Sequence, residues 1–402
     1  MNRRLSVRLG LSAACTSTRF SRTGFAPLPP QSPDPCSAVV LEHPPSDRKY
    51  ARRWSAFRIA SAGLTLAGIL TATGLLGQSF TLFNLPTIGG SPSVIVTGQD
   101  GNLWFPEEFE NKIARISPSG TVTEFVIPVP SANPFAITRG SDGNLWFTDV
   151  GSPPQIGRIT LQGTITLFTV PAAAASKCIV GGPDGNLWFT EALGVGIGRL
   201  TPAGALVEFP VTFGNVPDGI CNGPDGNLWF AEYSGNKIGK ITTTGSITEF
   251  PLPTSNSSPS GIASGPDGSI WFTEMSNNKI GRITTSGAIS EFSIPTGNSL
   301  PGFITVGADG NLWFTETNAR QIGRITLNGT VTEYLIPGST FMVPLGITSG
   351  PDGNIWFTQR NPDAVGRLTL GLVAAAVPAL SRSLFWALVL SLGVAGCYLA
   401  KR

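Results

Sequence analysis

Short stretches of alternating hydrophobic and polar residues, separated by turn residues, run through the middle of the chain. Residues 259–295 show the pattern clearly, with extended stretches at 260–264, 270–274, 279–284 and 288–295. Pro-Asp-Gly, Asn-Asn and Ser-Gly sequences separate them, and these favour turns because Gly accepts positive φ while Asp, Asn and Ser stabilise turn backbones. Alternation with a period of two is typical of β-strands. The segment therefore predicts four strands.

This four-strand segment recurs seven times, each time with a variant of the phrase Gly-Pro-Asp-Gly-Asn-Leu-Trp-Phe-Thr-Glu. Its tryptophans are Trp104, Trp146, Trp188, Trp229, Trp271, Trp313 and Trp356, at intervals of 42, 42, 41, 42, 42 and 43 residues. A period of about 40 residues built from short strands is typical of a β-propeller blade. The pattern predicts an all-β fold: a seven-bladed β-propeller of four-stranded blades over residues 80–370.

The two ends of the repeat array complement each other. After residues 365–369 the seventh repeat lacks a fourth strand, whereas residues 80–86, before the first repeat, read like the fourth strand at 249–253. We expect residues 80–86 to pair with 365–369 as an N-terminal outer strand that closes the ring, so that no wide sheet edge stays exposed.

The N-terminal flank differs from the repeats. Arg52, Arg53 and Arg58 precede an uncharged apolar run at 59–77 that contains small residues. This order is typical of a secretory signal peptide, which we expect over 53–79. A membrane anchor and a twin-arginine signal are the alternative interpretations. We expect residues 1–52 to be a disordered or miscalled N-terminal extension.

The C-terminal flank predicts a linker with a sorting motif over 371–382 and a transmembrane sorting or anchor helix over 383–402. Its apolar run, 383–400, ends in Lys401 and Arg402, and it is at the short limit for a spanning helix. Together with the preceding Val-Pro-Ala-Leu-Ser, it resembles an exosortase-type sorting tail. The resemblance implies an exosortase-type sorting protease as a partner and export to the periplasm or cell surface, with membrane anchoring that is at least transient.

The composition of the chain limits the kinds of partner that it is expected to bind. Charged residues make up 13% of the chain and the net charge is +2, so no basic face for a nucleic acid is expected, and we predict a monomer. Among five cysteines only Cys178 and Cys221 lie in the repeats. We expect two separate buried thiols, with a disulfide in an oxidising compartment as the alternative.

Features shared by all repeats are better explained by the blade than by a site. We expect the aspartate of each Asp-Gly sequence to form a turn, because one carboxylate per loop is too few for Ca²⁺. The Trp-Phe pairs are expected to fill the core between blades.

Acidic and basic positions also recur in every repeat. Second strands end in Glu107, Asp149, Glu191, Glu232, Glu274, Glu316 and Gln359. Third strands carry Arg115, Arg158, Arg199, Lys240, Arg282, Arg324 and Arg367. We interpret these as a ring of acid–base pairs; alternatively, the acids lie near one mouth of the channel and bind a cation or polarise a ligand.

Positions at which the copies differ are better candidates for function. The inner strands begin with Ser93, Phe135, Lys177, Asp218, Ser260, Gly302 and Leu345 at equivalent places. Such positions line the channel mouth, where propellers commonly bind ligands. We expect a site around Lys177 and Asp218 on neighbouring blades, with Asp218, Glu191 and Tyr233 binding the ligand. An ion pair between Lys177 and Asp218 without a ligand is the alternative.

The repeated phrase, together with Asn-Lys-Ile-Gly-Arg-Ile and Thr-Glu-Phe-Pro-Leu-Pro-Thr, resembles the streptogramin B lyase (virginiamycin B lyase) family over residues 80–370. The resemblance implies a Mg²⁺-dependent elimination that opens the ester of a cyclic depsipeptide, with histidines as acid and base and glutamates near the metal. Glu232 and Glu274 are then the candidate Mg²⁺ ligands and catalytic residues. The only histidine is His43, upstream of the propeller, so Lys177 is the candidate catalytic base.

Two hypotheses follow. In the first, the protein is an exported, envelope-associated lyase that opens a cyclic ester or depsipeptide. In the second, it is a non-catalytic surface propeller that binds a peptide, glycan or protein partner at the channel mouth. The lack of a histidine in the repeats favours the second.

Overall fold

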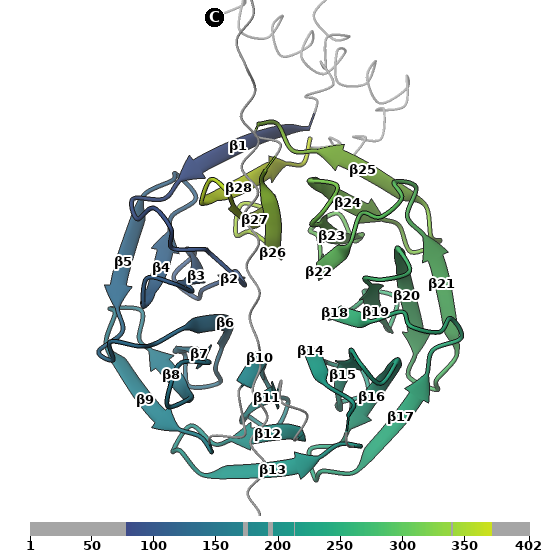
Figure 1. The fold of residues 1–402 in the computed structure, drawn as a ribbon, viewed down its shortest axis with the longest axis horizontal. Coiled ribbons are helices and arrows are strands. Elements are labelled where there is room, and N and C mark those ends of the chain that lie inside the picture. The colour runs from purple at the N-terminus through teal and green to yellow at the C-terminus, as the bar shows by residue number, and fades with distance from the viewer. Residues whose placement is uncertain (1–77, 172–175, 192–195, 213, 339–340, 372–402) are drawn as a thin grey trace, which may run out of the picture. The chain divides into compact units, whose positions relative to one another are not determined.

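The computed structural model describes residues 78–171, 176–191, 196–212, 214–338 and 341–371. These form seven four-stranded antiparallel sheets arranged as the blades of a propeller around a central channel (Figure 1). The predicted all-β fold, the blade number and the four strands per blade are confirmed. No helix of the described residues is long and apolar enough to cross a membrane.

Each blade runs from an inner strand at the channel to an outer strand at the rim. The inner strands are β2 (Val96–Thr97), β6 (Pro134–Arg139), β10 (Ser176–Gly181), β14 (Pro217–Asn222), β18 (Pro259–Ser264), β22 (Pro301–Val306) and β26 (Val343–Ser349). The second strands are β3 (Leu103–Glu107), β7 (Leu145–Asp149), β11 (Leu187–Glu191), β15 (Leu228–Glu232), β19 (Ser269–Glu274), β23 (Leu312–Glu316) and β27 (Ile355–Arg360).

The outer half of each blade holds the remaining two strands. The third strands are β4 (Lys112–Ile116), β8 (Gln155–Ile159), β12 (Gly196–Leu200), β16 (Lys237–Ile241), β20 (Lys279–Thr284), β24 (Gln321–Ile325) and β28 (Ala364–Thr369). The outer strands are β5 (Val122–Val126), β9 (Ile165–Thr169), β13 (Leu206–Pro210), β17 (Ile247–Pro251), β21 (Ile289–Ser293), β25 (Val331–Leu335) and β1 (Ser79–Asn84). We number the blades 1 to 7 from β2.

Strand β1 closes the ring, as the sequence predicts. It pairs antiparallel with β28 from Ser79 opposite Thr369 to Asn84 opposite Ala364. The ring of Phe83 stacks on Trp356, with 5.4 Å between centroids and 9° between planes. The last blade is thus built from both ends of the propeller (Figure 1).

The propeller has two distinct faces. One, here the turn face, carries the Asp-Gly turns between first and second strands and the turns between third and outer strands. The other, the mouth face, carries the connections into each inner strand and from each second strand to the third. Because Ser79 and Thr369 are opposite each other at the turn-face end of their strands, both ends of the described propeller lie on the turn face.

One stack repeats between blades and fills the core. In blade 5, Trp271 stacks on Phe292 at 5.6 Å, and the Arg282 guanidinium lies 5.5 Å from the Trp271 ring centroid. Asp267 in the turn accepts a hydrogen bond from the indole N–H at 3.1 Å. The seven tryptophans of the repeats are fully buried. The expected core role of the Trp-Phe pairs and the turn role of the aspartates are therefore confirmed.

The expected ring of acid–base pairs between second and third strands is wrong. Strand pairing places Arg282 opposite Trp271 and places Lys279 opposite Glu274. Arg282 is consequently near the turn face, where it lies 3.6 Å from Asp267. Equivalent pairs to turn aspartates form in blades 1, 2, 4, 6 and 7. The buried acids at the ends of the second strands do not share these partners.

The cysteines can be compared with the sequence predictions, whereas the two flanks of the propeller cannot. Cys178 and Cys221 are separate free thiols, as predicted; Cys178 is buried, whereas Cys221 is only half-buried. The N-terminal extension (1–52), the C-terminal helix (383–402) and almost all of the signal peptide (53–79) and linker (371–382) lie outside the described residues.

Phe83→Ala tests the closure. Loss of the Trp356 stack and of the packing against the blade 1 core should lower the free energy of unfolding by about 2–3 kcal/mol in urea titrations. Val126→Ala is the control, since Val126 lies on an outer strand but is 67% exposed, and should cost under about 0.5 kcal/mol. Equal losses in both variants would contradict the closing role of Phe83.

Candidate functional site

Three polar side chains meet at the channel mouth on neighbouring blades. The Lys177 ammonium lies 2.9 Å from Asp218 Oδ1, and the Ser260 hydroxyl donates to Asp218 Oδ2 at 2.8 Å. They stand on β10, β14 and β18, which are adjacent around the channel (Figure 1). Because each occupies the same place in its repeat, neighbouring blades bring them side by side. We call this set the mouth arc.

Electrostatics define what Lys177 can do. Burial alone would lower the pKa of Lys177, but the Asp218 carboxylate, with a smaller contribution from Tyr233, raises it above its usual value. A general base at neutral pH needs a pKa near the ambient pH. Lys177 is therefore a fixed cation that suits binding of an anion or carbonyl oxygen, and it does not fit the role of a base.

Tyr233 completes the polar side of the mouth. It follows β15, is 38% exposed, and interacts electrostatically with Lys177. The structure thus brings together Lys177, Asp218 and Tyr233, three of the residues that the sequence selects. A partly exposed phenol beside a cation offers both an apolar ring and a hydrogen-bonding group to a ligand.

Two aromatic side chains from inner strands of other blades contact the blades of the mouth arc. Phe135 on β6 and Phe303 on β22 both pack against the hydrophobic cluster of blades 3 and 4 that contains Cys178 and Ile220. Strands β6 and β22 belong to blades 2 and 6 and stand on different sides of the channel (Figure 1). The mouth therefore combines a charged and hydroxylated side with an apolar one.

The predicted site glutamates lie elsewhere. Glu191, Glu232 and Glu274 are fully buried at the ends of β11, β15 and β19. Glu232 accepts a hydrogen bond from Asn215 at 2.6 Å. The charged groups that act on the three acids are on third and outer strands of their own blades, and the mouth arc is not among them. Glu191 and Glu232 lie opposite Ser176 and Pro217, the residues that precede Lys177 and Asp218, but they form no ion pair with Lys177, and each of the three acids is in a different blade.

Burial changes the ionisation of these acids. Desolvation, the largest cause, raises the pKa of Glu107, Glu191, Glu232 and Glu274 to about 7 and that of Glu316 to about 8. A neighbouring outer-strand carboxylate adds to the rise, for example Glu249 beside Glu232. These groups are largely protonated below neutral pH.

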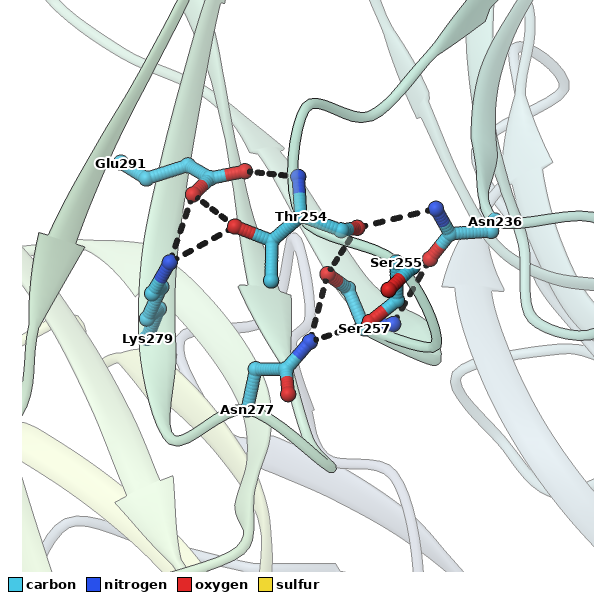
Figure 2. A network of polar contacts seen from close by, with 7 residues as sticks. All are labelled: Asn236, Thr254, Ser255, Ser257, Asn277, Lys279 and Glu291. Atoms are coloured by element: carbon cyan, nitrogen blue, oxygen red, sulfur yellow. Dashed lines mark hydrogen bonds and ion pairs between the residues drawn. The ribbon is translucent and has the colours of Figure 1, made fainter.

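A lysine network, which sequence reasoning missed, links neighbouring blades on the mouth face. The Lys279 ammonium donates to Glu291 and to the Thr254 hydroxyl, both at 2.7 Å (Figure 2). Thr254 lies in the connection from blade 4, and its carbonyl accepts a hydrogen bond from Asn236 at 3.0 Å. The signal was a lysine at the start of the third strand with a glutamate 12 residues later.

The same network occurs in two other blades. Lys112 joins Glu124 and Thr87 in blade 1. In blade 4, Lys237 and Thr212 both bind Glu249. In blades 1, 4 and 5 the lysine is thus the cation beside the buried acid.

This arrangement does not fit a Mg²⁺ ion shared by Glu232 and Glu274. The two acids are on separate blades, and Lys237 and Lys279 already supply positive charge beside them. Among the described residues there is no group of three or more acidic, cysteine or histidine side chains that could hold a metal ion. Mg²⁺ prefers near-octahedral oxygen coordination with one or two carboxylates and several waters. We therefore assign no step to Mg²⁺.

The buried acids predict an unusual pH dependence of stability. Between its ordinary pKa of 4.5 and about 8, folded Glu316 keeps a proton that the unfolded chain has lost. The free energy of unfolding therefore falls as pH rises through this window, by up to about 1.4 kcal/mol per pH unit for one group. Urea titrations from pH 5 to 9 should show this decrease in the free energy of unfolding, and Glu316→Gln should make the decrease smaller. Gln359 shows that a blade accepts an amide at this position. A stability that rises from pH 6 to 8 would contradict the assignment.

Comparisons with known proteins agree with the geometry of the fold. The sequence matches the Virginiamycin B lyase family over residues 68–257 and 175–377. A streptogramin B lyase structure is 40% identical, with a TM-score of 0.70, and covers 73% of this chain and 99% of its own. A catalytically inactive histidine-to-alanine variant of virginiamycin B lyase from Staphylococcus aureus, solved with quinupristin, is 42% identical, with a TM-score of 0.69, covering 73% and 100%.

More distant likenesses concern the fold alone. The WD40 propeller domain of Doa1 is 11% identical with a TM-score of 0.57, covering 72% of this chain and 97% of its own. No curated protein matches the chain. The family match spans most of the propeller, and the identity to solved members is high over nearly their whole length. The chain therefore belongs to the virginiamycin B lyase family.

Proposed function

We propose that this protein binds a cyclic peptide or depsipeptide at the mouth face without opening it. The observation that carries the proposal is the mouth arc: Lys177, Asp218 and Ser260 are assembled on three adjacent blades, and the Asp218 carboxylate raises the pKa of Lys177 and so keeps it a cation. The arc offers an ammonium for carbonyl oxygens, and Tyr233 and Phe135 offer apolar surface. Peptide macrocycles present both kinds of group.

The histidine content supports binding over catalysis. The chain contains one histidine, His43, outside the propeller. The S. aureus relative with a histidine replaced by alanine is described as catalytically inactive, and it was nevertheless solved with quinupristin. A family member that lacks such a histidine can therefore still hold a ligand.

Quinupristin is the probe for this proposal. Isothermal titration should give saturable binding, and Asp218→Asn should weaken it about tenfold, because Lys177 loses the carboxylate that positions it; this corresponds to about 1.4 kcal/mol. Mass spectrometry of the same samples, with and without MgCl₂, should find no ring-opened product.

The control is Ser286→Ala, which removes an exposed hydroxyl that contacts only Thr284 on the turn face and should leave binding unchanged. An affinity that is equal in Asp218→Asn and the original protein would refute the role of the mouth arc. Absence of any binding to quinupristin would refute a streptogramin-like ligand.

A lyase is the second candidate, favoured by the 40–42% identity to solved family members and by the pKa of Glu232, about 7, which is in the range of a general base. Ring opening that requires MgCl₂ and is abolished by Glu232→Gln would establish this function. It would overturn the proposal of binding without turnover.

We also propose that the protein is exported and tethered to a membrane through its C-terminal apolar segment, 383–400. The described propeller ends at Gln78 and Gly371, which both line one hollow of the turn face with Asp309 and Gly353. Tethering from that face would leave the mouth face accessible to ligands. Cell fractionation and protease treatment of intact cells would test the location.

A further inference from the structure

Blade 6 differs from blades 1, 4 and 5 in the charges around its buried acid. In blades 1, 4 and 5 a lysine ammonium lies against the carboxylate of the outer strand, as Lys279 does with Glu291 in Figure 2. The ammonium provides the positive charge beside two carboxyls, one at the end of the second strand and one on the outer strand.

Blade 6 has the same two carboxyls but lacks the lysine. Gln321 is at the lysine position, opposite Glu316 on β23 as Lys279 is opposite Glu274 on β19. Glu333 is equivalent to Glu291 and accepts the Thr296 N–H at 2.9 Å, as Glu291 accepts the Thr254 N–H at 3.2 Å.

The carboxyls of Glu316 and Glu333 thus interact with no lysine beside them, and the residue opposite Glu316 is an amide. Glu316 is fully buried, neither of its carboxyl oxygens receives a hydrogen bond, and the charge of Glu333 acts on it. The Gln321 carbonyl oxygen is also buried and lacks a donor. The hydroxyl of Ser299, which neighbours Glu316, donates to Asn278 instead.

No positive side chain in the described part of the propeller compensates this charge. Neither Glu316 nor Glu333 takes part in an ion pair there, whereas the outer-strand acids of blades 1, 4 and 5 each pair with a lysine. Arg320 precedes Gln321 in the chain but forms no ion pair with either acid, and Arg324 pairs with Asp309 at the turn face.

We propose that blade 6 binds a hard metal cation between Glu316, Glu333 and Gln321, at the place that a lysine ammonium occupies in blades 1, 4 and 5. All available donors are oxygens, and the Thr296 hydroxyl and water can add to them. Ca²⁺ accepts such a mixture of carboxylate, amide, hydroxyl and water ligands in flexible geometry, so it fits best. The site differs from the expected Mg²⁺ pair, Glu232 and Glu274, which are beside lysines.

The experiment exchanges the residue that distinguishes the blades. Calorimetric titration of the protein with CaCl₂ should show one saturable site with a Kd of about 10⁻⁴–10⁻³ M. At 10 mM CaCl₂ the melting temperature should rise by about 2 °C relative to NaCl of equal ionic strength. Gln321→Lys should reduce the affinity at least tenfold, because the lysine fills the site.

The reciprocal variant is the matched control. Lys279→Gln recreates the blade 6 set in blade 5 and should add a second binding event. A melting temperature of Gln321→Lys that equals or exceeds the original would show that binding was lost without loss of the fold. Binding of Mg²⁺ or Na⁺ in place of Ca²⁺, also lost in Gln321→Lys, would support the site and assign its ion. The proposal is overturned if none of the three salts gives saturable binding, or if Gln321→Lys retains the original affinity.

Discussion

Closure of the ring by β1 and β28 is the constraint on which the rest of the structure depends. Each blade buries its tryptophan against the next blade, so an open ring would leave Trp356 without Phe83 and the blade 1 core without its cover. The mouth arc depends on the same closure, since Lys177, Asp218 and Ser260 are on three different blades and only the fixed angle between blades holds them together. A binding site built across blades is therefore as rigid as the ring.

Much of this fold could be predicted from the sequence because its determinants are local and repeated. The Asp-Gly turns fix the hairpins, the tryptophan spacing fixes the blade number, and the lack of an outer strand after the seventh repeat fixes the partner of residues 80–86. The ion pairs could not be predicted in this way. Which base lies opposite Glu274 depends on the register of β19 and β20, and a shift of three residues along the strand exchanges Lys279 for Arg282.

Part of the candidate site could also be predicted by comparing the repeats. Lys177, Asp218 and Tyr233 differ among repeats and lie at strand ends, so comparison of the copies selects them. Glu191, Glu232 and Glu274 are also at strand ends, but their side chains are buried in the blades. The sequence does not show whether the last side chain of a strand is buried in the blade or faces the channel mouth. Only the packing of the connection above each acid, such as Asn215 over Glu232, decides this.

Repetition also explains why the buried acids persist in so many blades. A carboxyl at the end of a second strand is costly when ionised, yet a lysine on the third strand reduces this cost in blades 1, 4 and 5. Blade 7 avoids the charge with Gln359 and has Ala364 in place of the lysine. Blade 2 keeps Asp149 opposite Gln155, so acid and lysine do not always change together. Blade 3 also lacks the lysine, with Gly196 in its place, but its outer-strand acid, Glu208, is exposed. Blade 6 has Gln321 in place of the lysine and keeps Glu316 buried and Glu333 half-buried. Its charge has to be balanced by a proton or by a cation from solution.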